Sequence, residues 1–341
     1  MVNQTDEIRN ADRIKQNALQ RPSSKQGRPM AFTSTRKRAS MIGCLLWLAG
    51  LLLPVVFSSS WVTIGGIFAV YAIVALSQDV VLGRAGMYDM GHAVYFGIGA
   101  YVSAILNVSF NWPILYTVPL AVGLAALLGA VLSAPIVKLR GDYLLLVTLG
   151  LNAIFVLALK NNIFGVTGGP DGIFGVGAPT VFGYVLGSQS ALFYMNWVAL
   201  ALILWLVGNL DRSALGRTFR YLKSDELAAV TVGVNPHIYK VGVFALAAAI
   251  AGFAGSLFAM QLSGVSPGSF QFADSVTLFA IVLVGGQASV PGVLLGTALM
   301  FVVPQVFTSL AQYRYLVFGA AMIAVMIARP QGIWPSRRAV R

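Results

Sequence analysis

Long apolar runs separated by short polar stretches dominate the chain from residue 41 onward. Each run approaches the roughly 20 residues that a helix needs to cross the hydrocarbon core of a bilayer. The pattern therefore predicts an all-α fold, a polytopic transmembrane helical bundle of about eight to ten membrane segments. The ten candidate segments are 41–57, 62–82, 87–107, 113–138, 143–160, 191–209, 237–260, 273–287, 292–309 and 315–328.

Glycine-rich interruptions break the apolar pattern at Arg84–Gly91 and at Gly285–Gly292. The second interruption leaves 273–287 and 292–309 as two short spans or as one broken or re-entrant element. Non-helical backbone at membrane depth is tolerated only where protein or a watery cavity covers it, and paired interruptions point to a transport path. Close contact between helices is instead favoured for four other glycines, Gly97, Gly99, Gly252 and Gly255.

Composition supports a membrane protein. Of the 341 residues, 57% are hydrophobic and 10% are charged, whereas soluble domains carry about 25% charged residues. The single cysteine, Cys44, excludes an internal disulfide framework, and two histidines are too few for a histidine-built metal site. We therefore expect neither a metal ion nor another cofactor.

Basic residues gather on one side of the expected topology. With a cytoplasmic N-terminus and ten alternating segments, 21 of the 23 Lys and Arg residues face the cytoplasm, and only Lys160 and Arg314 do not. This asymmetry predicts a multi-pass protein with both termini in the cytoplasm. Although the formal charge is +12, we expect no nucleic-acid partner, because an exposed basic face with interleaved aromatic residues is missing.

The expected domain organisation has three parts. Residues 1–40 form a disordered basic cytoplasmic tail, 41–328 form the transmembrane domain, and 329–341 form a second basic cytoplasmic tail. The run 41–57 could be a signal peptide, but its long polar lead and the spans that follow favour an uncleaved helix. Two connections exceed turn length, an external loop at about 161–190 and a cytoplasmic region at 210–236.

The cytoplasmic region contains a helical pattern at about 217–232, and Gly233 is placed to end it in a left-handed conformation. A short isolated helix is unstable in water, so this one must lie on the bilayer surface or dock onto a cytoplasmic partner. Small residues on this helix would allow a partner to approach closely, and charged residues would fix the position of the helix against that partner. The residues concerned are Arg217, Asp225, Glu226, Ala228 and Ala229.

Ionisable and polar residues within the spans are costly and often functional. Asp89 and His92 share one helix face, which leaves a proton relay, a polar path lining and a local hydrogen bond open. Asn152 could join helices or contact a solute. For Asp79 an interfacial cap is favoured, and Asp274 is expected to cap the segment that begins near residue 273.

Short motifs occur in a fixed order along residues 45–335. They are Gly83–Gly91 with His92 and GIGAY at 97–101, LRGDY at 139–143 with VTL at 147–149, TGG at 167–169 with Gly172, Gly216-Arg217 with SDELAA at 224–229 and GVN at 233–235, Gly285-Gly286 through Pro291-Gly292 and Gly296, and RPQG at 329–332. In this order they resemble the branched-chain amino-acid permease family of ABC importers. The stretch 224–235 resembles the coupling-helix motif of that family.

The resemblance implies a bacterial plasma (inner) membrane permease that moves branched-chain or other small amino acids into the cytoplasm by alternating access. The implied partners are cytoplasmic ATP-binding subunits, a second permease subunit that is related or identical, and an extracytoplasmic substrate-binding protein. The related urea permeases share much of the pattern, so short amides stay open. Asp89 stands where the family usually has serine, and Gln287 where an apolar residue or glycine is commoner.

The resemblance also suggests roles for individual residues. Coupling to the ATPase is implied for Arg217, Asp225, Glu226, Ala228, Ala229 and Gly233. The candidates for the translocation path are Asp89, His92, Thr148, Asn152, Gly285, Gly286 and Gln287.

The sequence also bears on two other classes of function. A stand-alone secondary transporter or channel would explain the spans and the Asp89–His92 pair, but not the charged helix at 217–232. A membrane-embedded enzyme would need a nucleophile–base constellation, and the HExxH motif does not occur. The GxxxxGK[ST] phosphate loop is missing too, so we expect no catalysis by this chain and ATP hydrolysis on a partner.

Cysteine labelling tests the predicted topology. A cysteine placed at Asp171 should react with a membrane-impermeant thiol reagent added outside, because 161–190 is external. A cysteine at Lys223 should react only after the membrane is opened, and the unaltered chain with Cys44 gives the background. The reverse pattern would contradict the topology.

Overall fold

The computed structural model describes residues 58–306, except 140, 182 and 232, together with residues 50, 54, 316, 319, 320, 323, 327 and 332–334. The segments expected at 41–57 and 315–328 lie mostly outside the described residues, and so do the two basic tails apart from 332–334. The described residues belong to one compact unit that begins at Gly50.

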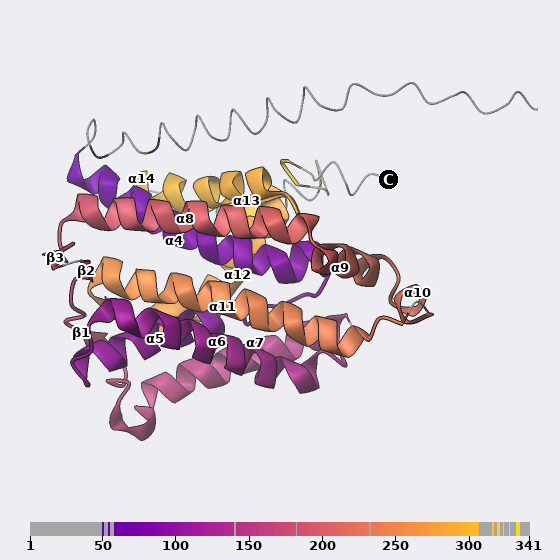
Figure 1. Ribbon diagram of the computed structural model, residues 1–341, viewed down its shortest axis with the longest axis horizontal. Helices are drawn as coiled ribbons and strands as arrows, with labels where there is room; N and C mark the ends of the chain where they lie inside the picture. Colours follow the sequence, from indigo (N-terminus) through magenta and orange to yellow (C-terminus); the bar gives the residue numbers. More distant parts are fainter. Residues whose placement is uncertain are drawn as a thin grey trace, which may run out of the picture. The chain divides into compact units, whose positions relative to one another are not determined.

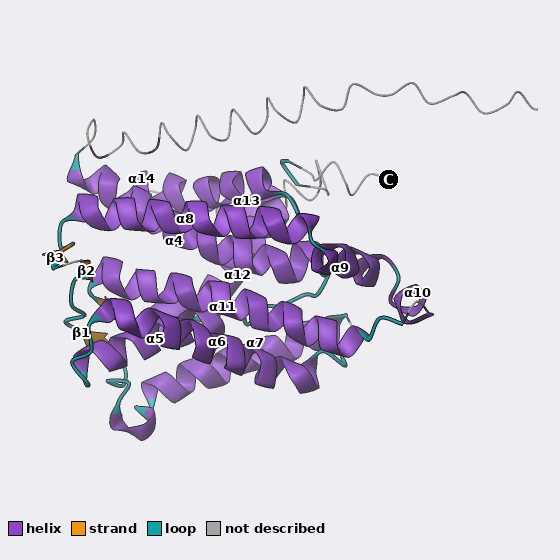
Figure 2. Ribbon diagram, viewed as in Figure 1, coloured by secondary structure: helices purple, strands orange, loops and turns teal. Residues whose placement is uncertain are grey.

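Helices make up nearly all of the described structure (Figure 2). The long elements are α4 (Ser59–Asp79), α5 (His92–Val108), α6 (Ile114–Ile136), α7 (Asp142–Lys160), α8 (Gln189–Arg212), α11 (Pro236–Leu262) and α12 (Phe272–Gly285). The shorter ones are α9 (Ala214–Ser224), α10 (Glu226–Thr231), α13 (Val290–Thr297) and α14 (Val303–Val306). Two π-helical turns, η1 (Val80–Arg84) and η4 (Ala298–Val302), extend α4 and α13, and two 3₁₀ turns are η2 (Ile163–Gly165) and η3 (Pro267–Phe270).

The described bundle is all-α and polytopic, as the hydropathy pattern predicts. Five helices are long and apolar enough to cross a membrane: Ser59–Arg84, Ile114–Ile136, Asp142–Lys160, Gln189–Arg212 and Pro236–Leu262. Three shorter apolar helices, His92–Val108, Phe272–Gly285 and Val290–Gln305, occupy the other expected segments within 58–306. Because a 14-residue helix is only about 21 Å long, α12 falls short of a full crossing.

Four two-residue strands form two antiparallel pairs. Strand β1 (Ile173–Phe174) pairs with β4 (Gly264–Val265), and β2 (Thr180–Val181) pairs with β3 (Tyr184–Val185). The first pair ties the long loop at 161–190 to the segment that follows α11. Figure 1 shows β1, β2 and β3 at one end of the bundle, and α9 and α10 at the opposite end. The two long connections therefore lie at opposite ends, as the alternating topology requires.

Helix α11 is the central packing element, since it contacts α4, α5 and α6. Its small residues let the backbones approach closely: a Cβ at Gly99 of α5 would meet the backbone of Gly252, and one at Gly255 would meet Phe96 O. These contacts confirm that the glycines serve helix packing. The hydroxyls of Ser103 and Ser256 (2.7 Å) add a buried hydrogen bond between α5 and α11.

Gly99→Ala tests this packing. The added methyl group would collide with the Gly252 backbone, and overpacking of this kind costs about 1–3 kcal/mol. We expect a lower thermal unfolding midpoint in detergent. Gly150→Ala is the matched control, because a Cβ at Gly150 in α7 meets nothing within 4 Å and alanine favours the helix. Equal midpoints for the two variants would contradict the packing role.

Candidate functional site

The region 210–236 contains two helices, α9 and α10, where the sequence predicted one helix at 217–232. Asp225 separates them in an extended conformation, and its Oδ1 accepts hydrogen bonds from Leu227 N (2.9 Å) and Ala228 N (3.1 Å). Asp225 thus caps α10, which gives it a local structural role. Helix α9 starts before Gly216, because the Ser213 hydroxyl accepts from Gly216 N (3.1 Å) and caps it.

Two of the predicted coupling residues sit at the ends of α10. Gly233 follows the helix with φ +84°, the left-handed conformation that the sequence predicts, and a Cβ there would meet nothing within 4 Å. Glu226 opens the helix, and its Oε1 accepts from Lys240 Nζ of α11 (2.9 Å). This ion pair links α10 to the bundle.

The remaining coupling candidates divide by exposure. Ala229 is 2% exposed and packs inward, whereas Ala228 is exposed. On either side, Leu227 is 72% and Val230 51% exposed, so α10 presents apolar side chains at the end of the bundle. Arg217 on α9 is also exposed, and its guanidinium donates to Arg212 O (3.1 Å).

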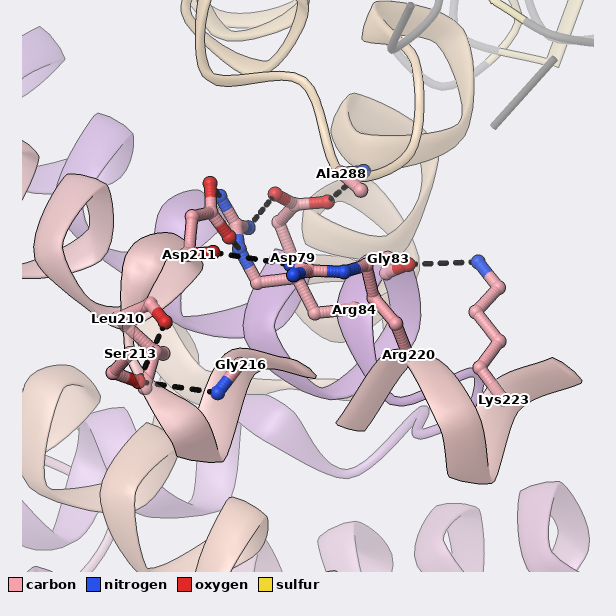
Figure 3. Close-up of polar contacts among 10 residues, drawn as sticks. All are labelled: Asp79, Gly83, Arg84, Leu210, Asp211, Ser213, Gly216, Arg220, Lys223 and Ala288. Carbon is pink, nitrogen blue, oxygen red and sulfur yellow. Dashed lines mark hydrogen bonds and ion pairs between the residues drawn. The ribbon is translucent and has the colours of Figure 1, made fainter. Parts of the chain in front are cut away.

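Lys223 anchors α9 to η1 and to the α12–α13 turn. Its ammonium donates to Gly83 O (2.7 Å) in η1 (Figure 3). It also donates to Gln287 Oε1 (3.1 Å) in the α12–α13 turn. Desolvation by burial lowers the pKa of Lys223, and the charge of Asp79 opposes this shift. Gln287, a path candidate, therefore contacts the α9–α10 pair through Lys223.

The α12–α13 turn is tightly constrained. Gly286 has φ +119° and Ala288 has φ +55°, and Gly285 lies so close to Gly292 that a Cβ on either would meet the other's backbone. Gly285, Gly286 and Gln287 thus form a compact turn against η1 and α9.

A buried charged cluster that the motifs did not indicate lies beside this turn. Arg84 is 3% exposed and forms ion pairs with Asp79, which is fully buried, and with Asp211 at the end of α8 (Nε–Oδ1, 2.7 Å). The prediction of an interfacial cap for Asp79 is wrong, because its side chain caps no helix. The sequence does contain one indication of this cluster, namely two carboxylates and an arginine at the ends of apolar segments.

Asp89 and His92 do lie together, both buried in the segment that opens α5. His92 Nδ1 is 3.0 Å from Asp89 Oδ2, and Nε2 is 2.7 Å from Ser77 Oγ of α4. The Ser77 hydroxyl also donates to Val74 O (2.6 Å). His92 therefore bridges Asp89 and Ser77, which fits a local buried hydrogen bond as well as a polar path lining.

Thr148 and Asn152 lie one turn apart on α7 and contact the segments that precede α5 and α12. Thr148 Oγ1 accepts from Met90 N (3.0 Å), next to Asp89, and Asn152 Nδ2 donates to Phe270 O (3.2 Å). Asn152 Oδ1 is buried without a hydrogen-bond partner, and so is the hydroxyl of Tyr101, whose ring packs on Phe270 (5.9 Å between centroids). The structure thus joins Asp89, His92, Thr148 and Asn152 in one interior group.

Asp274 has the capping role that the sequence predicts. Asp274 caps α12 from its third position, since its Oδ2 accepts from Gln271 N (3.1 Å), which confirms the capping role. Among the described residues, no group of three or more His, Cys, Asp and Glu side chains is placed to hold a metal ion.

The chain is similar to known transport proteins over most of its length. Residues 60–326 match the family described as the branched-chain amino acid transport system permease component. The high-affinity branched-chain amino acid transport system permease protein LivM of Escherichia coli (strain K12) is 35% identical over 333 residues, which cover 91% of this chain and 78% of that protein.

More distant relatives show the same likeness. A probable branched-chain amino acid transport permease protein LivM of Methanocaldococcus jannaschii is 26% identical, over 79% of this chain and 92% of that protein. The permease protein BraD of Pseudomonas aeruginosa is 26% identical, over 77% of this chain and 91% of that protein. No solved structure matches.

The family match spans more than half of the chain, and the membrane-spanning bundle agrees with it. The chain is a multi-pass membrane protein and a transport subunit, not an enzyme. It belongs to the branched-chain amino acid permease family of ABC transporters.

Proposed function

We propose that this permease subunit carries branched-chain amino acids, or other small amino acids, into the cytoplasm by alternating access driven by a partner ATPase. The observation that carries the proposal is the α9–α10 pair. The pair lies at one end of the bundle (Figure 1) and exposes Leu227 and Val230. Through Lys223 it contacts Gly83, next to the first glycine-rich interruption (Figure 3), and Gln287 in the second. A partner that binds this pair can therefore act directly on the segments that interrupt the spans.

The exposed face of α10 suits a protein partner. Leu227, Ala228 and Val230 supply apolar area, and Glu226 supplies a charge for register. This end is then cytoplasmic, and the opposite end, with β1–β3, faces a substrate-binding protein. That assignment follows the charge asymmetry, which places both termini in the cytoplasm of a bacterium. A second permease subunit, related or identical, completes the assembly.

The interior favours a solute without strong net charge. The described spans place neutral groups such as Thr148, Asn152 and Tyr101 inside, and the acidic Asp89 is paired with His92. The Lys and Arg residues of the described spans lie near helix ends. Burying an unpaired carboxylate is costly, so a dicarboxylate finds no counter-charge. The names of the relatives point to branched-chain amino acids.

A proton-driven secondary transporter is the alternative, and the buried Asp89–His92 pair is the observation in its favour. Purified chain in vesicles separates the two functions. Uptake that needs an ATPase subunit and ATP supports the importer, whereas uptake driven by a pH gradient without a partner supports the alternative.

Gly233→Val should impair coupling without loss of the protein from the membrane. A β-branched residue is strained at φ +84°, and the strain would displace α10 from its docking position. We expect reduced uptake and weaker retention of the ATPase on copurification. Gly233→Asn is the matched control, because asparagine accepts the left-handed conformation and space is available. Wild-type uptake by Gly233→Val would refute the role.

Glu226→Gln should weaken ATPase retention by at least about tenfold, since removing one member of a charge pair buried at an interface costs about 2–5 kcal/mol. The comparison is Lys240→Gln, which breaks the same intrachain ion pair from the other side. If Glu226 served only that pair, the two variants would behave alike. A partly exposed pair contributes at most about 1 kcal/mol, so neither variant should unfold.

The preferred solute should be a zwitterion with an apolar side chain. In vesicles with the ATPase and binding protein, unlabelled leucine, isoleucine or valine should compete for uptake better than a dicarboxylate or urea. The reason is the neutral interior described above. A dicarboxylate that competes best would contradict the proposal, and urea that competes best would favour the short-amide alternative.

A further inference from the structure

Arg84 joins two segments that are remote in sequence, α4–η1 and the end of α8 (Figure 3). Its Nη1 binds Asp79 Oδ2 within α4–η1, and its Nε and Nη2 bind Asp211 Oδ1 (2.7 Å) and Oδ2 (3.2 Å) at the end of α8. The planar guanidinium suits this arrangement, because it presents several donors in fixed directions. One side chain therefore fixes the relative position of η1 and the end of α8.

The carboxylate of Asp79 extends the connection to the α12–α13 turn. While Oδ2 binds Arg84, Oδ1 accepts from Ala288 N (2.7 Å). A Cβ at Gly83 would collide with Oδ1 and with Ala288 N, so glycine is required for η1 to fit against the turn. π-helical turns such as η1 are frequent at functional sites. Arg84, Asp79 and Ala288 thus form a continuous hydrogen-bonded path.

The other end of the path reaches the first turn of α9. Asp211 lies two residues before Ser213, the residue that caps α9, and Asp211 O accepts from Arg220 Nη1 (3.2 Å). Gly216 fits against Leu210 O so closely that a Cβ would collide with it. A displacement of α9 must therefore displace Asp211. Lys223 provides a second, more exposed link from α9 to Gly83 and Gln287.

A buried cluster of charged side chains contributes little by itself to the free energy of folding. Desolvation of buried ions offsets most of their attraction, and apolar residues of similar volume are often as stable or more so. Charged hydrogen bonds do impose distance and direction, because the energy is lost when the atoms separate. The cluster therefore fits a device that keeps moving segments in register.

We propose that Arg84, Asp79 and Asp211 are positioning residues that transmit displacement of the α9–α10 pair to η1 and the α12–α13 turn. This inference rests on the proposed function, since it needs a partner that moves α9–α10. In this proposal the cluster transmits movement and is not part of a solute-binding or ATP-binding site. Its loss should uncouple hydrolysis from transport while the docking surface on α10 stays in place.

Two conservative variants test the relay. Asp211→Asn keeps the shape but removes the charge that binds Arg84, at a side chain that is 25% exposed. Arg84→Lys keeps the charge but cannot bind both aspartates in the same geometry. Each is assembled with the ATPase subunits in vesicles, and solute uptake, ATP hydrolysis and ATPase retention are measured. Ser256→Ala, which removes a buried hydrogen bond between α5 and α11, is the control for general destabilisation, and Arg212→Lys controls for the end of α8.

The number of solute molecules moved per ATP should fall at least about fivefold in Asp211→Asn and Arg84→Lys, the lower end of typical coupling between sites. ATPase retention should stay within twofold of wild type. Ser256→Ala and Arg212→Lys should keep the wild-type ratio, even where Ser256→Ala lowers the unfolding midpoint. If both cluster variants fail to fold, Lys223→Met breaks the exposed second link and should lower the same ratio.

An unchanged ratio in a folded Asp211→Asn or Arg84→Lys would overturn the relay. So would an unchanged ratio in Lys223→Met, if only that variant folds. A ratio that falls equally in Ser256→Ala would show that general destabilisation is the cause, and would also overturn it. Failure of the proposed function looks different, because wild-type protein would then retain no ATPase and show no ATP-dependent uptake.

Discussion

Backbone groups that leave a helix inside the bundle need a hydrogen-bond partner, because lipid offers none. The buried polar side chains of this protein meet that need at its interruptions. Asp79 accepts from Ala288 N, Lys223 donates to Gly83 O, and Gln78 donates to Asp89 O (2.7 Å). Further along, Thr148 accepts from Met90 N, Asn152 donates to Phe270 O, and Ser275 accepts from Ala93 N (3.2 Å). Without these partners the interruptions could not exist at their present positions.

The same requirement links the interruptions to one another. The side chain that binds a free backbone group of an interrupted segment belongs to a different helix. Each such hydrogen bond therefore fixes the distance between two elements. Thr148 and Asn152 of α7 hold the segments before α5 and α12, while Lys223 holds η1 and the α12–α13 turn. Movement of one element therefore strains bonds at another, which is the property that a transporter with two openings needs.

Glycine packing complements this arrangement. Helices α5 and α11 meet through Gly99, Gly252 and Gly255, and dispersion between closely packed backbones replaces the hydrophobic effect that lipid cannot supply. Directional polar bonds are concentrated instead beside the interruptions and at the end near α9. The bundle thus combines a closely packed centre with junctions that are held by directional polar bonds.

The sequence by itself determined the spans, the glycine interruptions, the opposite placement of the two long connections, the left-handed Gly233 and the capping by Asp274. These features depend on hydropathy, small-residue content and capping within a few positions, which are local properties. Tertiary structure alone decided the partners of the buried polar groups. Arg84 contacts Asp211 across 127 positions, Asp79 contacts Ala288 across 209, and Gln287 contacts Lys223 of α9. Such contacts depend on which helices become neighbours, and no local period records that choice.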